Sequence, residues 1–256
     1  MESSCVAKES HRYGFQDFIT GPSNQAAFAA ALAVSRAPAK AHNPLIIFGD
    51  PGLGKTHLLQ AIGGQIRHTT PRARILASGS ETFNGDLLRA MTRSTYGQHQ
   101  GRYTDCDLLL FDDFQFLRDT PQVQKEFYLI CDKLLENGKQ VVVTAEMNTY
   151  STLRRSTFGR FCLEKGLMET ISPPSFAERQ KFLMERALKL NHCLPAEVIE
   201  HIAAMVEGSY CELEGGLNRV VAFSKCFQKP IQLSTAQLAL SHISHISLPK
   251  RWKVHP

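Results

Sequence analysis

The stretch "FGDPGLGKTHLL", Phe48 to Leu59, decides the fold of this chain. It follows the apolar run "PLII" and carries the pattern G-x-x-x-x-G-K-[ST] on Gly49, Gly54, Lys55 and Thr56. Glycine suits such a loop because backbone N–H groups can turn toward phosphate oxygens when no Cβ interferes. We therefore predict a strand, a phosphate loop and a helix, with Lys55 on the β- and γ-phosphates and the Thr56 hydroxyl on Mg²⁺. An ordinary Gly-rich turn is the alternative, which the flanking strand and helix disfavour.

A second motif, "DLLLFDD", supplies carboxylates. Leu108 to Phe111 are apolar, as in a buried strand, and Asp112 and Asp113 follow at its carboxyl end, where open α/β sheets bind their ligands. We predict that Asp112 holds Mg²⁺ through water and that Asp113 orients or deprotonates the attacking water. A solvated strand end is the alternative, and the phosphate loop upstream favours the functional site.

The composition describes a globular chain with a mild positive charge. Of the 256 residues, 43% are hydrophobic and 21% are charged, which is typical of a folded protein rather than a disordered one. Lys and Arg number 29 against 24 Asp and Glu, so the net charge is +5. This excess is compatible with nucleic-acid binding but does not establish it.

The cysteines and the apolar runs favour a cytoplasmic protein. The seven cysteines are spaced singly, without a Cys-x-x-Cys pair, and an odd number does not suit a disulfide framework. We expect them to act as small buried hydrophobic residues. No apolar run is long enough to cross a membrane, and the start of the chain lacks the apolar core of a signal peptide.

Strand and helix patterns alternate over the first two thirds of the chain. Such alternation indicates a parallel sheet covered by helices on both faces. An Ala-rich helix with Ser23 as its N-cap precedes the first strand and ends near Pro38. We expect strands at 45–48, 74–77, 107–112, 140–144 and, weakly, 167–171, and further helices at 55–67, 81–93 and 121–137.

The segment "ISPPSF" at 171–176 marks a boundary near Pro173 and Pro174. After it only helical patterns remain, at 177–190, 195–206 and 210–227, followed by a short tail. The predicted organisation is an N-terminal arm at 1–20, a P-loop α/β domain at 21–173, a small helical lid at 174–246 and a tail at 247–256.

Three segments together resemble one family, the AAA+ nucleotide-binding region of the bacterial replication initiator DnaA and its short relatives. They are "GPSNQAAFAAALAVSRAPAKAHNPLIIFGDPGLGKTHLLQAIG", "LLLFDDFQFL" and "CELEGGLNRVVAF", and the likeness runs from about Tyr13 to Leu240. The resemblance implies a five-stranded parallel sheet and a helical lid that bind ATP or ADP with Mg²⁺ between them, with residues 21–24 beside the adenine. It implies nucleotide contacts from Gly49, Gly52, Leu53, Gly54, Lys55, Thr56, His57 and Arg219.

Arg219 is the nucleotide sensor that the resemblance implies in the lid. Ser209 and Glu212 form a capping box that opens its helix. Gly215 precedes Arg219 by one turn and Gly216 is adjacent, and because two helical glycines cost about 1 kcal/mol each relative to alanine, we expect something bulky to approach this face. A solvated surface arginine is the alternative. The apolar stripe, from which Arg219 points away, consists of Leu213, Leu217, Val220 and Phe227.

The resemblance implies two further catalytic residues besides Asp113. Arg160, in "FGRF", corresponds to the arginine that such proteins present to the ATP of a neighbouring subunit, with Arg154 and Arg155 as the other candidates. The stretch between Arg160 and the proline pair is two residues longer than usual in the family. Glu146 corresponds to a sensor at the end of the fourth strand, where the family usually carries Asp, and the longer carboxylate changes its distance to the γ-phosphate.

The function implied by the resemblance is ATP binding in DNA replication initiation or its regulation. The ATP form would assemble with itself or with a DnaA-family initiator through Arg160, with at most weak Mg²⁺-dependent ATPase activity. Two alternatives stay open. One is a non-catalytic regulator that docks on the initiator, similar to the short relative Hda, and the other is a helicase-loader-like factor for single-stranded DNA.

The sequence predicts different outcomes for duplex DNA and for single-stranded DNA. A full initiator continues into a helix-turn-helix domain, so we expect no sequence-specific reading of duplex DNA from these residues, whether they form a natural short relative or a shortened form. Single-strand binding stays open. Arg89, Arg93 and Arg102 make the region after the second strand basic, whereas Gln122 stands where the family carries a basic residue.

Overall fold

A computed structural model describes residues 13–117, 120–151 and 164–241 of the chain. The chain divides into two compact units, Met1–Ser172 and Pro173–Pro256, each with its own hydrophobic core. The junction falls beside the boundary predicted near Pro173 and Pro174.

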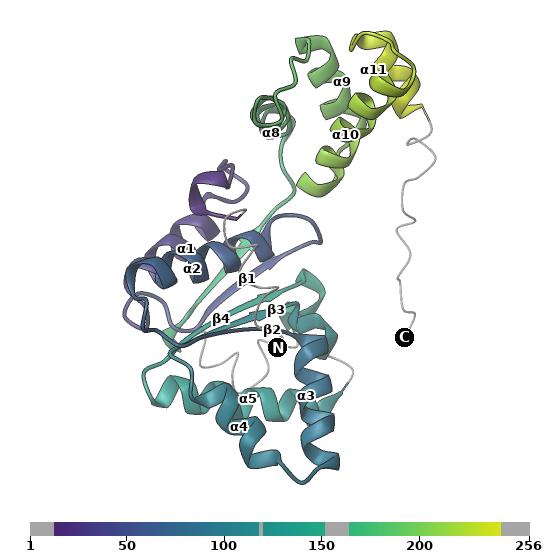
Figure 1. Cartoon of the computed structure of the whole chain (residues 1–256). Coiled ribbons are helices and arrows are strands. Elements are labelled where there is room, and N and C mark those ends of the chain that lie inside the picture. Colours follow the sequence, from purple (N-terminus) through teal and green to yellow (C-terminus); the bar gives the residue numbers. More distant parts are fainter. Residues whose placement is uncertain (1–12, 118–119, 152–163, 242–256) are drawn as a thin grey trace. The chain divides into compact units, whose positions relative to one another are not determined.

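The first unit is built on a five-stranded sheet whose strands all run parallel. Their order across the sheet is β2-β3-β4-β1-β5 (Figure 1), so β4 separates β1 from β3. All five predicted strands are present, and the predicted α/β fold class is confirmed. The strands span Leu45–Gly49 (β1), Ile75–Gly79 (β2), Leu108–Asp112 (β3), Gln140–Ala145 (β4) and Leu167–Ile171 (β5).

The burial of each strand explains how clear its apolar pattern is in the sequence. β1 and β4 are buried throughout, because helices cover both faces of these inner strands, and their residues are nearly all apolar. The edge strands β2 and β5 are largely half-buried, and β5 includes Glu169 and Thr170. A half-solvated edge strand therefore gives the weak pattern seen at 167–171.

Helices cover both faces of the sheet. α1 and α2 lie on one face and α3, α4 and α5 on the other (Figure 1), with one hydrophobic core on each side. α2 packs so closely that a Cβ at Gly63 would lie 2.7 Å from the Leu110 side chain of β3. These helices span Gln25–Arg36 (α1), Lys55–Thr69 (α2), Ser80–Thr92 (α3), Tyr96–Thr104 (α4) and Pro121–Glu136 (α5).

Two features of this unit differ from the prediction. The N-cap of α1 is Asn24 rather than Ser23, and the Asn24 side chain accepts a hydrogen bond from the Gly21 N–H at 2.9 Å. Helix α4 is absent from the prediction because its sequence, "YGQHQGRYT", contains two glycines and buries only His99 and Tyr103. A helix of this kind depends on tertiary packing rather than on its own periodicity.

The second unit packs four described helices around its own core. Ser209 caps α10 as predicted, accepting from the Glu212 N–H at 3.2 Å, but a full capping box forms instead at Ser175 and Glu178 on α8. Phe227 lies beyond α10 and is 61% exposed, so its predicted place in the buried stripe is wrong. The last helix, α11, lies within the predicted lid at 174–246 but was not among the helices predicted there. The helices span Phe176–Lys189 (α8), Ala196–Met205 (α9), Tyr210–Cys226 (α10) and Leu233–Leu240 (α11).

The described cysteines divide between core and surface. Cys106 and Cys131 are buried as expected, whereas Cys193, Cys211 and Cys226 are exposed free thiols, so the expectation of burial is wrong for these three. The other two cysteines lie outside the described residues. Within the described ranges, none of the helices combines the length and the apolar character needed to span a bilayer.

A buried histidine lies in the core shared by α3, α4 and α5. His99 is 6% exposed, packs against the rings of Phe83 and Tyr103, and has no hydrogen-bond partner for either ring nitrogen among the described residues. Burial lowers the pKa of His99, and the carboxylates of Glu126 and Asp86 oppose that shift only in part. The neutral imidazole is therefore the form that this core accommodates.

We expect the free energy of unfolding to fall as the pH is lowered from about 7.5 to about 5. The unfolded chain binds a proton at His99 near pH 6.5, above the lowered pKa of the folded chain, so stability that is complete above this pH is lost below it. Urea unfolding of His99→Leu should show a flatter pH dependence, whereas His68→Gln, at an exposed histidine, should keep the wild-type dependence. An unchanged pH dependence in His99→Leu would contradict this assignment.

Candidate functional site

The phosphate loop connects the end of β1 to the first turn of α2. Gly52 and Gly54 have φ angles of 75° and 98°, in the left-handed region that glycine adopts without a Cβ penalty. Gly49 has no room for a side chain, because a Cβ there would lie 3.0 Å from the Ile171 carbonyl oxygen of β5. Leu53 is 2% exposed and packs in the core on the α1 and α2 side, so only its backbone is available to a ligand.

Lys55 folds back over the loop that precedes it. Its ammonium donates to the carbonyl oxygens of Gly49 at 2.8 Å and Asp50 at 3.0 Å, and the residue is buried. Burial lowers the pKa of Lys55, and the surrounding carboxylates, Asp113 foremost, oppose that shift. A positive charge fixed over the loop is the arrangement that neutralising phosphate oxygens requires.

His57 faces the N-terminal segment rather than the loop. Its Nε2 lies 2.9 Å from the Gly14 carbonyl oxygen, and its ring packs edge-on against Tyr13 and Phe18. Phe18 also contacts the loop, 3.0 Å from the position of a Cβ on Gly54. The ring of His57 is therefore engaged elsewhere, and the predicted nucleotide contact would have to come from its backbone. That contact stays a prediction.

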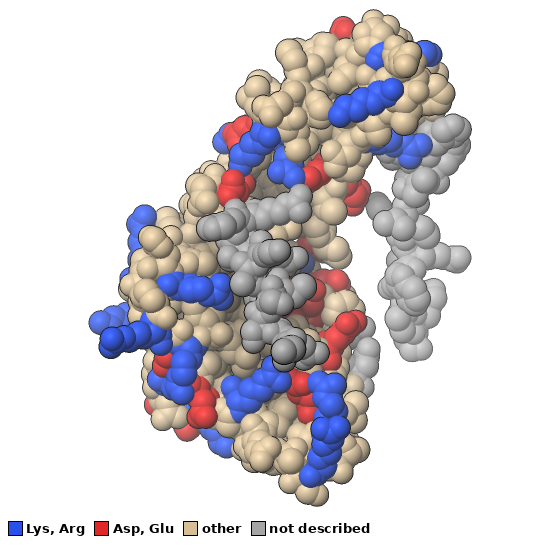
Figure 2. All heavy atoms as spheres, viewed as in Figure 1, with Lys and Arg blue, Asp and Glu red and all other residues tan. Residues whose placement is uncertain are grey.

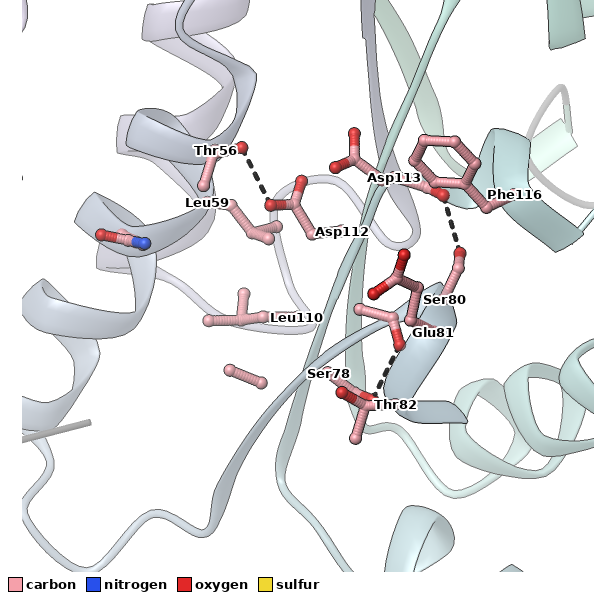
Figure 3. A pocket seen from close by; sticks show the side chains of 13 residues that line it. Thr56, Leu59, Ser78, Ser80, Glu81, Thr82, Leu110, Asp112, Asp113 and Phe116 are labelled. Atoms are coloured by element: carbon pink, nitrogen blue, oxygen red, sulfur yellow. Dashed lines mark hydrogen bonds between the residues drawn. The ribbon is translucent and has the colours of Figure 1, made fainter. Parts of the chain in front are cut away.

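Asp112 bonds side chains of two other elements at the carboxyl end of β3. Thr56 Oγ1 on α2 donates to Asp112 Oδ2 at 2.8 Å (Figure 3). Thr144 Oγ1 on β4 donates to Asp112 Oδ1. Burial raises the pKa of Asp112, and the Thr144 hydroxyl is the largest opposing influence. An ionised Asp112 would gain from a nearby cation, because burial disfavours its isolated charge.

The donor set at this edge of the sheet fits Mg²⁺. A hydroxyl and a carboxylate are hard oxygen ligands, and Mg²⁺ sites in nucleotide-binding proteins use one or two such groups together with phosphate oxygens and water. In the described part of the chain, no cluster of three or more His, Cys, Asp or Glu is suited to hold a metal. Thr56 and Asp112 would therefore hold the ion only with phosphate and water as further ligands.

Asp113 has a constrained backbone. Its φ angle of 58° lies in the left-handed region, which is uncommon for residues other than glycine. Its N–H donates to Thr144 Oγ1 at 3.0 Å, and its carbonyl oxygen accepts from Ser80 Oγ at 2.7 Å. Hydrogen bonds from β4 and from the start of α3 thus fix the peptide groups on both sides of this residue.

Gln115 links Asp113 to Glu146. It lies in the 3-10 turn Phe114–Leu117 (η2), and its Nε2 donates to Asp113 Oδ1 at 2.9 Å and to Glu146 Oε1 at 3.3 Å. Sequence reasoning did not single out Gln115 or Thr144. The available signal was their position, since each stands within three residues of a predicted acidic site residue.

A pocket of about 480 Å³ opens beside the acidic pair, between α2 and the ends of β2 and β3. Figure 3 shows the Asp112 and Asp113 carboxylates at the edge of this space, with Ser80 and Glu81 from α3 opposite α2. Leu59 and Leu110 form an apolar part of the pocket wall. Three of the predicted site residues, Thr56, Asp112 and Asp113, therefore border an open space that has both polar and apolar walls.

Arg219 lies on the exposed side of α10, as predicted. Its Nε donates to the Ala239 carbonyl oxygen near the end of α11, at 2.7 Å. A Cβ at Gly216 would lie 3.3 Å from Ile202 of α9, so close helix packing explains this glycine. A Cβ at Gly215 would meet no described atom within 4 Å, so the expected bulky neighbour is not found there.

The predicted trans arginine cannot be placed. Arg160 and its alternatives Arg154 and Arg155 lie outside the described residues, as do the predicted tail at 247–256 and residues 1–12 of the predicted arm. Their roles stay predictions.

The three arginines predicted to make the region after β2 basic lie on α3, just after it and on α4. Lys and Arg side chains gather over α3 in Figure 2, with Asp and Glu beside them. Arg89 and Arg102 both bond to Asp86, at 2.5 Å and 2.7 Å, whereas Arg93 is exposed at the end of α3. Gln122, at the start of α5, is also exposed.

The phosphate loop, the acidic pair and the sheet order have a counterpart among known proteins. The family model of the bacterial DnaA ATPase domain matches residues 9–160, which contain the phosphate loop and the acidic pair. The chain belongs to this family. The resemblance predicted from the sequence is thereby confirmed.

Curated relatives of the chain include chromosomal replication initiators. DnaA of Deinococcus deserti is 41% identical over 234 residues, which are 91% of this chain and 51% of the relative. DnaA of Thermomicrobium roseum is 37% identical over 229 residues, 90% of this chain and 49% of the relative. The chain thus spans about half the length of the curated relatives that it matches.

Solved structures of DnaA have the same fold. Domain III of the Thermotoga maritima initiator superposes with a TM-score of 0.82 at 31% identity, covering 90% of this chain and 95% of that one. A replication initiator DnaA bound to AMPPCP and single-stranded DNA superposes with a TM-score of 0.74 at 27% identity, covering 82% and 65%.

Replacing Thr144 with valine should destabilise the first unit. The side chain is fully buried, and the change keeps its shape while removing a hydroxyl that serves both Asp112 and the Asp113 N–H. A buried polar group left without its partner costs about 1–3 kcal/mol. Urea unfolding should show a loss of about 2 kcal/mol for Thr144→Val and a clearly smaller loss for Thr56→Val, at an exposed threonine. Equal losses would contradict the structural role of Thr144.

Proposed function

We propose that this protein binds ATP or ADP with Mg²⁺ in the cytoplasm and acts in DNA replication initiation or its regulation. One observation carries the proposal: the Lys55 ammonium lies over the phosphate loop while the next residue, Thr56, bonds the acidic strand at Asp112. Membership of the DnaA family and the likeness to an initiator bound to AMPPCP support it.

Each of the two units would contribute different contacts to the nucleotide. In the first unit, loop N–H groups and Lys55 receive the phosphates, and Thr56 and Asp112 hold Mg²⁺, which would neutralise charge on the phosphate oxygens. The second unit would act as the lid, with Arg219 as the sensor. The bond from Arg219 Nε to Ala239 leaves the two Nη groups for a phosphate oxygen, because a guanidinium carries five N–H donors.

Hydrolysis would be slow and would serve to end a signal. Asp113 would orient or deprotonate the attacking water, and Glu146 would sense the γ-phosphate from the end of β4. Both carboxylates contribute to the electrostatic environment of Lys55, which supports their proximity to the phosphate site.

The ATP form would assemble with itself or with a DnaA-family initiator, with Arg160 completing the site of a neighbour. A second positive charge on the γ-phosphate favours both assembly and hydrolysis. A regulator that docks on the initiator without turnover is the alternative within the same family.

Single-stranded DNA is a second candidate ligand. The exposed arginines of α3 and α4 favour it, as does the single-stranded DNA bound by one structural relative. Gln122 and the pairing of Arg89 and Arg102 with Asp86 weaken the positive charge that such binding needs.

Calorimetry with magnesium tests the nucleotide site directly. The wild type should bind both ATP and ADP, and Lys55→Ala should weaken binding at least about 100-fold, because the phosphate charge loses its counter-ion. Lys40→Ala, at an exposed lysine of the same unit, is the matched control and should bind normally. A folded wild type that takes up neither nucleotide would overturn the proposal.

Arg160→Ala should leave nucleotide binding intact and abolish ATP-dependent assembly. The measurement is oligomer size by light scattering with ATP and with ADP, each with and without single-stranded DNA. An oligomer that becomes larger with ATP alone supports ATP-dependent assembly. An unchanged oligomer size supports the docking regulator. An increase in size that requires DNA supports the factor for single-stranded DNA. Equal assembly of variant and wild type would remove Arg160 from this role.

A further inference from the structure

We propose that Gln115 is a positioning residue for ATP hydrolysis, which holds the Asp113 carboxylate in place and couples it to Glu146. The inference rests on the proposed function, in which Asp113 acts on the attacking water. It assigns a role to a side chain that touches both predicted acidic residues and lies between the ends of β3 and β4.

The carboxamide of Gln115 is fully engaged by these two residues. Its two N–H donors go to Asp113 Oδ1 at 2.9 Å and Glu146 Oε1 at 3.3 Å, and its Oε1 accepts from the Glu146 N–H at 3.2 Å. Two ionised carboxylates are acceptors only, so they cannot bond each other. A neutral amide with two donors is the group that can bridge them.

The Glu146 end of the bridge is rigid. Glu146 Oε2 accepts from Asn148 at 3.0 Å, and its carbonyl oxygen accepts from the Thr149 hydroxyl at 2.6 Å. Thr149 is fully buried. Gln115 is therefore anchored to a fixed point at the end of β4, and it can in turn fix what it holds.

At the Asp113 end of the bridge the backbone is fixed, and only the side chain can move. The left-handed backbone is held through Thr144 and Ser80, so rotation about the side-chain bonds is the remaining motion. The bond to Oδ1 removes that rotation. Among the described residues no side chain bonds Oδ2, so this oxygen is the one available to a water molecule.

The step that Oδ2 would serve balances without any further reactant. The oxygen of the attacking water forms a bond to the γ-phosphorus, and the bond from that phosphorus to the β,γ-bridging oxygen breaks, its electron pair leaving with ADP. The water proton passes to Asp113 Oδ2. Misplacement of such a group by about 1 Å can cost about 100-fold in rate, and Gln115 would prevent that displacement.

Single-turnover hydrolysis of ATP by Gln115→Leu tests the inference. The rate constant should fall about 10- to 100-fold, while the Kd for ATP stays within about twofold, because the bridge acts on the water and not on the phosphates. Gln115→Asn keeps the amide but is one methylene shorter, and it should lose less than the leucine variant. Gln124→Leu is the matched control: Gln124 bonds the carbonyl of Leu117 in the same turn, at 3.0 Å, and its loss should leave the rate unchanged.

Hydrogen exchange gives a readout that does not depend on turnover. The Glu146 amide should exchange faster in Gln115→Leu than in the wild type or in Gln124→Leu, because it loses its acceptor. Equal rates of hydrolysis in Gln115→Leu and wild type, or a loss of ATP affinity that matches the loss of rate, would overturn the inference. ATP uptake without turnover in the wild type would overturn it and leave nucleotide binding standing, whereas no uptake at all would overturn the proposed function and this inference with it.

Discussion

The bond from Thr56 to Asp112 spans a gap that the sheet order creates. The phosphate loop follows β1 and the acidic pair follows β3, but β4 lies between these strands, so their ends are about 10 Å apart. Thr144 at the end of β4 occupies the gap, donates to Asp112 and accepts from the Asp113 N–H. Thr56 connects the start of α2 to Asp112, and Thr144 of the intervening strand connects Asp112 to the Asp113 backbone, so the loop and the acidic pair keep their relative positions.

The polar groups at this edge satisfy one another, which makes the edge rigid. A buried polar network is stabilising when each member has its partner and costly when one is lost. Around Asp113 the partners come from α3, η2 and β4, through Ser80, Gln115 and Thr144. The core near His99 shows the opposite condition, since its two ring nitrogens lack partners among the described residues. The first arrangement suits a site that must hold a fixed geometry, and the second predicts a core whose stability depends on pH.

Much of this architecture can be predicted from sequence because it rests on local patterns. The inner strands are continuous apolar runs, and the phosphate loop needs glycine at positions that its backbone fixes, such as Gly54 with its φ of 98°. What sequence cannot supply is the choice of partner across the fold. Thr144 and Gln115 are ordinary polar residues until the sheet order places them against Asp112 and Asp113. Helix α4 was missed because a few side chains packed on α3 and α5 hold it, rather than any helical periodicity.

The pairing of Asp86 with two arginines affects how α3 and α4 would meet a polyanion. A nucleic acid carries condensed cations, and their release when arginines neutralise its phosphates is what makes binding favourable at low salt. Arg89 and Arg102 already share a carboxylate, so a phosphate that reached them would exchange one anionic partner for another. The entropy gained by such an encounter would come mainly from exposed residues such as Arg93, and attraction to this face would weaken less steeply with ionic strength than its arginine content suggests.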